Sequence, residues 1–529
     1  MDSEAISQVP FRGKPHSAIV NLPDELLANI FQFVRNSVSQ NWEVVAKVCR
    51  WWRNVALKEC TLWTEIKISS YRHTFTRARA YIERSGTALI SVELHAGGDY
   101  MRGLGDHQED GSVHTLCSNP IMEFVDLIRD HTTRIYELDL ALGEDSLEIL
   151  CNNLSFNLPS IQDLKIENYS FDSERRPIIP ILNHLRLRTL SLIRVVIPFT
   201  LQRLNSFCDL RELSLSYQDS STDVHSLSLE LFLDILQYFS SQLVVLSLIY
   251  SGPQQSSSTI SSRHGMIEMR TLKQLSLYNS AIRVATLLSH LIIPSTLCDL
   301  NILGEKLSRT SSHGLRELLP SQVPSLRRSC ELHIDAFPTN RCITLDGQDS
   351  SPSFIIRFSW DDAVEDFNTL VANTINDIPS VFSKAPLKIL HLTSDFAQLS
   401  SQCLHTMLDS YPLIQELQFQ CQAESPNVEF SIQYILDILY HDNTVRGEVG
   451  PRCPRLDALK LFGFTLDVDW FDQLQRCLLS RQTQKLKQLS LWECRARMGT
   501  MITDWKEDDM KSLVESYEIP DQYVEACLW

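Results

Sequence analysis

Few stretches of this 529-residue chain carry residue types that could perform catalysis. The glycine-rich stretch GGDYMRGLG (97–105) lacks both the glycine spacing and the Lys-Ser/Thr ending of a phosphate-binding loop. ERSGT (83–87) lacks the glycine that precedes the serine in a nucleophile elbow. Cys49 lies in an apolar helical run, where packing accounts for it better than nucleophilic chemistry does. We therefore predict no catalytic residue and no enzymatic activity.

The residues that most often bind metals are dispersed along the chain. There are 15 histidines and 14 cysteines, but no Cys-x-x-Cys pair and no Cys or His at zinc-ligand spacing. His333 and His391 fall on expected strands and could face a common surface. The sequence therefore predicts neither a metal site nor a cofactor, and the scattered cysteines are expected to be reduced thiols.

The composition limits the kinds of partner. The net charge is −17, which leaves no basic footprint for nucleic acid or for an anionic membrane surface. No apolar run approaches the roughly 18–20 residues of a membrane span. The first residues lack the basic head and apolar core of a signal peptide. We expect a protein of the cytoplasm, the nucleus or both, with neither nucleic acid nor membrane as its partner.

The N-terminal residues predict a small helical unit. Pro23, Asp24 and Glu25 suit the start of a helix. The apolar residues that follow recur at steps of three and four, on one helical face: Leu26, Leu27, Ile30, Phe31 and Val34. Two further apolar runs follow, and Leu62-Trp63 closes the unit. About forty residues cannot bury all these side chains, so part of the face should pack on another protein.

This unit resembles the fungal F-box-like domain. The resemblance rests on LPDELL (22–27), Ile30-Phe31, Val48-Cys49-Arg50, Trp52, Ala56 and Leu62-Trp63, and on YIERSGTALISVEL (81–94) after the domain. It implies docking on the Skp-type adaptor of a cullin–RING ubiquitin ligase through Leu22, Pro23, Leu26, Leu27, Ile30, Phe31, Val48, Cys49 and Trp52. Trp51 stands beside Trp52, and the sequence leaves open which of them faces inward. The alternative is a helical cap without a partner.

Beyond residue 88, apolar residues recur at positions i, i+3 and i+5. Twelve such triplets occur, and most of them start 23 to 33 residues apart, the period of leucine-rich repeats. They begin at Leu89, Ile135, Ile161, Leu187, Leu210, Leu243, Leu272, Leu297, Leu387, Ile414, Leu456 and Leu486. The last two members of a triplet point the same way from a strand. We therefore predict parallel strands stacked along the concave face of a curved solenoid, with helices outside. The alternative is a leucine-rich α/β protein without that order.

Between many of the triplets lie segments whose apolar residues recur at steps of three and four, as in a helix. They are 121–131, 229–239, 403–411, 431–441 and 471–480. The region 304–386 is the least regular, with expected strands at 331–334 and 353–360. Polar loops are expected at 97–114, 251–265, 346–353 and 441–454. A short helix within 503–519 is expected to cap the last repeat.

The predicted fold class is α/β, with a small all-α N-terminal domain before the repeats. The expected parts are a disordered segment 1–18, an F-box-like domain 19–66, a linking helix and first strand 67–94, a leucine-rich-repeat-like solenoid 95–500, and a cap or tail 501–529. This organisation suggests the substrate receptor of an SCF-type ligase, partnered by adaptor, cullin and a target protein. The alternative is a repeat scaffold that binds partners without ubiquitin transfer.

A target site is expected on the concave face, among the residues on either side of the last apolar residue of each triplet. The four candidates are Tyr278, His391, Phe462 and Trp492. Phe462 and Trp492 place two large aromatic rings on neighbouring expected strands, and such residues are enriched in binding hot spots. The alternative is that the C-terminal tail folds back and covers both rings.

Overall fold

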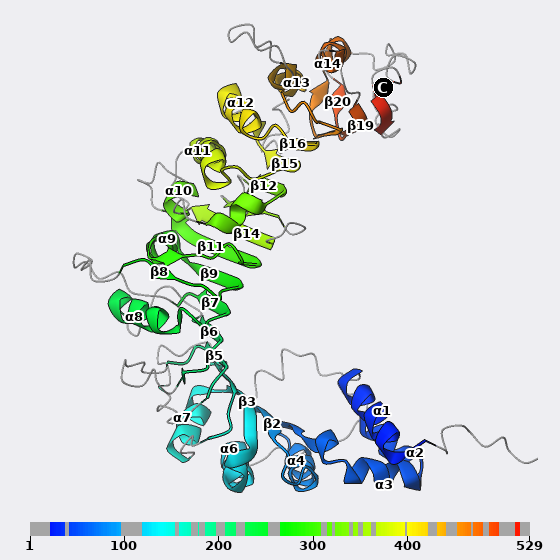
Figure 1. Ribbon diagram of the computed structural model, residues 1–529, viewed down its shortest axis with the longest axis vertical. Coiled ribbons are helices and arrows are strands. Elements are labelled where there is room, and N and C mark those ends of the chain that lie inside the picture. Colours follow the sequence, from blue (N-terminus) through cyan, green and yellow to red (C-terminus); the bar gives the residue numbers. More distant parts are fainter. Residues whose placement is uncertain are drawn as a thin grey trace, which may run out of the picture. The chain divides into compact units, whose positions relative to one another are not determined.

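In the computed structural model, the contacts divide the chain into two compact units, Met1–Arg186 and Leu187–Trp529 (Figure 1). The expected disordered segment 1–18 and the expected loop 97–114 lie outside the described residues, as do most residues of the other three polar stretches. The residues that the structure describes are 22–37, 42–96, 119–153, 158–170, 178, 186–196, 207–217, 228–251, 265–307, 315–319, 323–337, 342–347, 353–360, 367–396, 399–421, 431–440, 452–466, 469–479, 486–496, 511 and 514–518.

The first unit begins with the predicted short helices. α1 (Asp24–Ser37) has Asp24 and Glu25 in its first turn and Arg35 in its last, the charge order that the helix dipole favours. α2 (Val45–Val48) and α3 (Arg50–Lys58) are separated by Cys49, whose backbone is extended. The short 3-10 helices η2 (Trp42–Val44) and η3 (Cys60–Trp63) flank them.

An aromatic cluster ties these helices to the rest of the first unit. The ring of Trp63 lies 4.9 Å from that of Trp42 and 5.0 Å from that of Tyr81, and all three side chains are buried. The indole nitrogen of Trp63 donates to the carbonyl oxygen of Ala56 at 2.8 Å, so this buried donor is satisfied. The tryptophans at the ends of this region are therefore core residues.

A parallel sheet follows in the first unit. Its strands β1 (Glu65–Ser69), β2 (Ile90–Ala96), β3 (Ile135–Leu142) and β4 (Asp163–Asn168) pair in that order. Between them lie α4 (Arg72–Arg84), α6 (Pro120–Ile128), η4 (Arg129–Arg134) and α7 (Glu144–Asn153). The sequence reading missed β1, although buried Ile66 and Ile68 alternate with exposed Glu65 and Lys67, the pattern of a half-buried strand.

The second unit is built on a larger, mostly parallel sheet. Its strands lie in the order β5 (Thr189–Ile193), β6 (Glu212–Ser216), β7 (Val245–Ile249), β9 (Gln274–Ser280), β11 (Asp299–Leu307), β14 (Ser353–Trp360), β13 (Cys342–Asp346), β12 (Glu331–Phe337), β15 (Ile389–Ser394), β16 (Glu416–Cys421), β17 (Ala458–Phe462), β19 (Leu486–Trp492) and β21 (Val514–Glu518).

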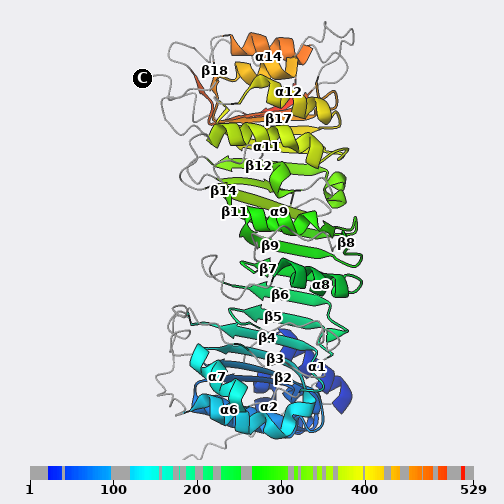
Figure 2. The same ribbon diagram turned by 90° about the vertical axis from the view of Figure 1, so that its left-hand side faces the viewer.

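The helices of the second unit cover one face of this sheet, as Figure 2 shows for α8, α9, α11 and α12. They are α8 (Leu229–Phe239), α9 (Ala281–Ser289), α10 (Leu315–Leu318), η7 (Pro324–Arg328), α11 (Phe367–Val381), α12 (Ser401–Ser410), α13 (Gln433–Tyr440) and α14 (Trp470–Leu479). Two short pairs complete the unit, β8 (Ile267–Glu268) with β10 (Leu291–Ile292) and β18 (Thr465–Leu466) with β20 (Arg495–Ala496).

In all twelve apolar triplets the last two residues lie on a strand and are buried. The helical segments expected from their spacing correspond to α6, α8, α12, α13 and α14. Mixed α/β structure with parallel strands is thus confirmed, and it follows from local patterns. A side chain two residues along a strand faces the same way, so each triplet secures its own strand in the core.

The region 304–386 departs from an all-parallel arrangement. Both expected strands exist, as β12 and β14, but their order in the sheet is reversed. β14 pairs with β11, β12 pairs with β15, and β13 lies between them, antiparallel to both. The prediction of uniformly parallel strands is therefore wrong here, because consecutive strands that follow one another closely in the sequence, β12, β13 and β14, pair antiparallel.

Of the segment 503–519, where a short helix is expected, the structure describes Lys511, which is helical, and residues 514–518, which are not. Residues 514–518 form β21, which pairs in parallel with β19 and buries Val514. Pairing with the open edge of β19 satisfies backbone groups that a strand edge otherwise leaves exposed, and this tertiary contact outweighs the helical preference of the local sequence.

Candidate functional site

The exposed face of α1 is the first candidate binding surface. Leu26 is 50 % exposed, Ile30 42 % and Phe33 73 %. Their spacing of four and three residues places them along one side of the helix. Leu27 and Phe31, one position further along the chain, have no exposed surface and pack inside the unit. The apolar pattern of α1 therefore consists of two adjacent stripes, one for the domain's own core and one left at the surface.

The structure separates the nine predicted adaptor-binding residues by exposure. Pro23, Leu26, Ile30, Val48 and Cys49 are exposed, Leu22 and Trp52 are half-buried, and Leu27 and Phe31 are buried. Sequence reasoning missed Phe33 and Val44, which is 52 % exposed. The signal for Phe33 was available, because it continues the four-then-three spacing from Leu26 and Ile30.

The two neighbouring tryptophans have different roles. The ring of Trp52 packs against Phe31, with 5.2 Å between ring centroids. The indole nitrogen of Trp51 donates to a carboxylate oxygen of Asp24 at 2.8 Å. Trp52 thus faces the domain core, while Trp51 ties the start of α1 to α3 through a polar contact near the surface.

Arg35 fixes the end of α1 against the sheet of the first unit. Its side chain is 8 % exposed and pairs with the carboxylate of Glu65 at the start of β1. Its guanidinium also donates to the carbonyl oxygen of Thr61 and, at 3.4 Å, to the hydroxyl of Thr64. These contacts hold the helix bearing the exposed apolar stripe in one position relative to β1.

The sheet face of the second unit is the second candidate surface. Phe462 on β17 is directly opposite Trp492 on β19, and their rings are nearly parallel with centroids 6.4 Å apart. Trp492 is 41 % exposed and Phe462 is half-buried. The described part of the tail, β21, lies alongside β19. Two aromatic side chains therefore remain accessible together on adjacent strands.

His391 belongs to a polar row that approaches this aromatic pair. Its ring lies 4.2 Å from the ring of His333 on β12, and its Nε2 lies 3.3 Å from a carboxylate oxygen of Glu416 on β16. The ammonium of Lys460 on β17 donates to the same oxygen of Glu416 at 2.5 Å. His333 contacts Glu331 at 2.5 Å. Among the described residues, no group of three or more His, Cys, Asp or Glu could hold a metal ion.

Burial and neighbouring charge shift the protonation of this row. Burial, reinforced by His333, lowers the pKa of His391 below its usual value. Burial alone would raise the pKa of Glu416, but the hydrogen bond and charge of Lys460, with help from His391, lower it. Near neutral pH the row therefore contains an ionised Glu416 between Lys460 and a neutral His391.

Tyr278 stands apart from the other three predicted target residues. It lies on β9, five strand positions or about 24 Å from His391 on β15. Its hydroxyl bonds to that of Tyr250 at 2.6 Å, and both phenols contact one carboxylate oxygen of Glu305. Burial, reinforced by the bonds to Glu305, raises the pKa of both tyrosines, so they act as neutral hydrogen-bond donors. The predicted residues thus form two separate clusters.

Comparison with known proteins assigns one part of the chain. Residues 19–69, which span α1 to β1, match the F-box-like family. No curated protein matches the sequence. Within the part of the chain that the structure describes, no helix is long and apolar enough to cross a membrane. The chain therefore contains an F-box-like domain at residues 19–69, whose first helix displays Leu26, Ile30 and Phe33 at its surface.

Proposed function

We propose that this protein is the substrate-recognition subunit of an SCF-type cullin–RING ubiquitin ligase. The F-box-like domain would dock on a Skp-type adaptor, which joins it to the cullin. The observation that carries the proposal is the coincidence of the family match at 19–69 with an α1 that leaves three large apolar side chains exposed. Exposed aliphatic and aromatic side chains at this density are typical of a docking surface.

The remainder of the chain is proposed to be a leucine-rich-repeat-like solenoid that binds the target. The support is the regular assignment of twelve apolar triplets to strands, with helices on one face of the second unit's sheet. In this proposal the solenoid spans 95–500, after an F-box-like domain 19–66 and a linking segment 67–94, and 501–529 form its end cap or tail.

In this proposal the chain has no catalytic role of its own and acts in the cytoplasm, the nucleus or both. Ubiquitin transfer would be performed by other subunits. The alternative is a repeat scaffold that binds partners without a ligase. Recovery of adaptor and cullin with the purified protein distinguishes the two, because only a ligase subunit needs both.

Adaptor docking is tested by two pairs of substitutions. Leu22→Ala with Pro23→Ala, and separately Leu26→Ala with Ile30→Ala, should abolish co-purification of the adaptor. Loss of one interface anchor typically costs on the order of 2 kcal/mol or more. Leu479→Ala is the matched control, since Leu479 is 58 % exposed but lies on α14 in the second unit. Adaptor recovery that survives both double substitutions would show that this surface does not dock the adaptor.

Target binding is tested at the aromatic pair. Phe462→Ala with Trp492→Ala should leave the melting temperature and adaptor binding unchanged and remove the proteins that co-purify through the second unit. Gln418→Ala with Gln420→Ala, two half-buried residues on the neighbouring strand β16, is the matched control. A large drop in melting temperature would instead mean that the pair stabilises the end of the sheet.

A further inference from the structure

A buried polar side chain lies beside the aromatic pair of the second unit, on the sheet face opposite the helices. Phe462 on β17 and Trp492 on β19 are in register, and their ring planes are 18° apart. Ser490, two residues before Trp492, faces the same way but is only 1 % exposed. A serine on an open sheet face is normally solvated. Ser490 therefore lies beneath the larger side chains around it.

Ser490 is part of a hydrogen-bond relay that holds a carboxylate near the two rings. Nε2 of Gln488 donates to the hydroxyl of Ser490 at 3.2 Å, and that hydroxyl donates to Oε2 of Glu518 at 3.3 Å. Glu518 lies on β21 in register with Ser490, so it is a diagonal neighbour of Trp492, roughly 7–8 Å away. Among the described residues, Oε1 of Glu518 has no hydrogen-bond partner and is left as an acceptor.

The negative charge of Glu518 is not balanced within the part of the chain that the structure describes, where no lysine or arginine pairs with it. The lysines of the two neighbouring strands are paired elsewhere. Lys460 pairs with Glu416 at 2.5 Å, and Lys487 pairs with Asp457 at 2.8 Å. The faces of aromatic rings also carry partial negative charge. The surface formed by the two rings and Glu518 therefore attracts a cation and repels an anion.

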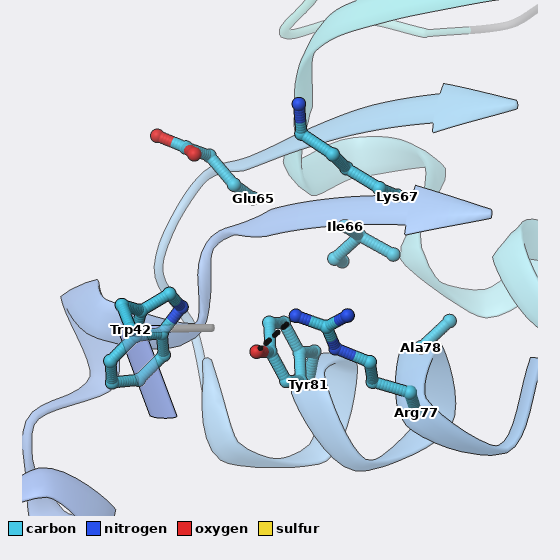
Figure 3. Close-up of a pocket in the computed structure, with 7 residues that line it drawn as sticks. All are labelled: Trp42, Glu65, Ile66, Lys67, Arg77, Ala78 and Tyr81. Carbon is cyan, nitrogen blue, oxygen red and sulfur yellow. Dashed lines mark hydrogen bonds between the residues drawn. The ribbon is translucent and has the colours of Figure 1, made fainter. Parts of the chain in front are cut away.

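A hollow beside β1 in the first unit shows the opposite arrangement of charge (Figure 3). The charged residues that line it are Glu65, Lys67 and Arg77, and each pairs with an opposite charge of the first unit. Arg77 also donates to the hydroxyl oxygen of Tyr81 at 3.2 Å, the bond drawn in Figure 3. The charges of that hollow are thus satisfied within the protein, whereas the carboxylate of Glu518 requires a cation from outside.

We propose that the rings of Phe462 and Trp492, together with the carboxylate of Glu518, bind an arginine side chain of the target protein. This inference rests on the proposed function, because it names what the target presents to the second unit. A flat guanidinium stacks on the exposed ring of Trp492 while its N–H groups donate to Glu518. A lysine ammonium makes the charge contact but cannot stack in this way, so arginine fits the surface better.

The chain itself offers no matching arginine in the places where one is needed. Residues 519–529, which directly follow Glu518, contain neither Lys nor Arg, so they supply no cation for its carboxylate. A two-fold dimer would place the same patch of both copies face to face. The strands that form this patch, β15, β16, β17, β19 and β21, contain no arginine. The charge of the site therefore favours a different protein over a symmetric second copy.

The first test compares two peptides that differ in one group. Acetyl-Gly-Ser-Arg-Ser-Gly-amide carries the guanidinium, and the same peptide with citrulline carries a neutral urea of nearly the same shape. Saturation-transfer NMR with the full-length protein should show that the arginine peptide binds with a Kd of about 1–10 mM. The citrulline peptide should bind at least about fivefold more weakly, because it lacks the charge. Absence of binding by the arginine peptide, or equal binding by both, overturns the proposal.

The second test places the binding on the surface of the protein. Glu518→Gln removes the charge of an exposed side chain, so it should keep the melting temperature and weaken the arginine peptide at least about fivefold. Trp492→Leu should weaken it to a similar degree. Glu515→Gln is the matched control, since Glu515 is exposed on the same strand but faces the other side of it. Equal effects of the two glutamate substitutions overturn the proposal, because net charge alone would then attract the peptide.

Failure of this inference and failure of the proposed function give different results. Adaptor recovery without binding of the arginine peptide would overturn the arginine site alone. Binding of the arginine peptide without adaptor recovery would overturn the ligase role and leave the arginine site in place. Sedimentation of the full-length protein completes the set, and we expect the same association state with and without Glu518→Gln. A dimer that Glu518→Gln dissociates would assign the site to a second copy and overturn the proposal.

Discussion

At the scale of single residues, position within a local pattern does not determine a side chain's role. Phe31 and Phe33 are two residues apart on α1, yet Phe31 is fully buried and Phe33 is 73 % exposed. Trp51 and Trp52 are adjacent, yet only Trp52 packs on Phe31. On a helix, neighbouring residues point about 100° apart, so small differences in sequence position separate core from surface.

The first prediction concerns pH and His391. Its folded-state pKa is lowered, so near and below pH 6.5 the unfolded chain binds more protons at this residue than the folded one. Its contribution to stability is therefore complete above pH 6.5 and is lost as the pH falls toward the folded pKa. We expect the free energy of unfolding, measured with urea at pH 7.5 and 5.5, to fall less in His391→Gln than in the unsubstituted protein.

The comparison between two proteins isolates this residue. His131 also has a lowered pKa, but it contributes equally to both. The groups that face His391 are His333, Glu416 and, through Glu416, Lys460. Glu416 titrates below the chosen pH window, because its own pKa is lowered from about 4.5. An identical fall in both proteins would contradict the burial of a neutral His391.

At the scale of secondary-structure elements, several strands of the second unit end in the same way. Arg194, Tyr250, Gly463 and Glu493 follow β5, β7, β17 and β19, and all have positive φ angles. In three of these turns the amide of that residue donates to a carbonyl oxygen of the neighbouring strand: Arg194 to Ser216, Tyr250 to Tyr278 and Gly463 to Trp492. The same turn thus follows strands that are far apart in the sequence.

Gly463 provides the prediction at this scale. Its φ is 74°, and a Cβ added there would lie 2.8 Å from the carbonyl oxygen of Cys421. Gly463→Ala should therefore lower the free energy of unfolding by about 1–3 kcal/mol, through left-handed backbone strain and this steric contact. Urea denaturation followed by circular dichroism provides the measurement.

Gly265→Ala is the matched control, because a Cβ at Gly265 would meet nothing within 4 Å. That substitution should change stability by no more than about 0.5 kcal/mol, or stabilise slightly by restricting the unfolded chain. Equal effects at the two glycines would mean that the turn after β17 rearranges to accept a side chain.

At the scale of the whole molecule, the proposed solenoid predicts how far along the sheet a destabilising substitution is felt. A repeat contacts only its neighbours, so stability is nearly a sum of local terms. Leu246 on β7 is fully buried, and Leu246→Ala should cost about 2–5 kcal/mol locally. Hydrogen exchange should accelerate in β6, β7 and β9 and remain unchanged in β17 and β19.

Ser247→Ala is the control for this prediction, since Ser247 lies on the same strand and points away from the core. It should leave exchange unchanged everywhere. Uniform acceleration across the second unit after Leu246→Ala would indicate one cooperative core and would argue against nearest-neighbour stacking.

The sequence by itself determined the features that depend on local pattern. Apolar residues two positions apart located the strands of all twelve triplets. Apolar residues three and four positions apart located helices such as α8 and α14. The F-box-like domain was also evident, because Leu22-Pro23, Cys49 and Trp63 stand at fixed spacings. These signals are local because each residue's facing direction follows from its own backbone.

Only the tertiary structure decided which strands are neighbours. The order β11, β14, β13, β12, β15 places His333 beside His391, although 58 residues separate them, and no local pattern encodes that pairing. Among the described strands β1 pairs with β2 alone, and Trp42 and Tyr81, which lie 39 residues apart in the sequence, line one hollow beside it. Strands with similar apolar patterns could pair in several orders. The order is therefore set by packing between segments that are distant in sequence, and the pattern of a single strand does not determine it.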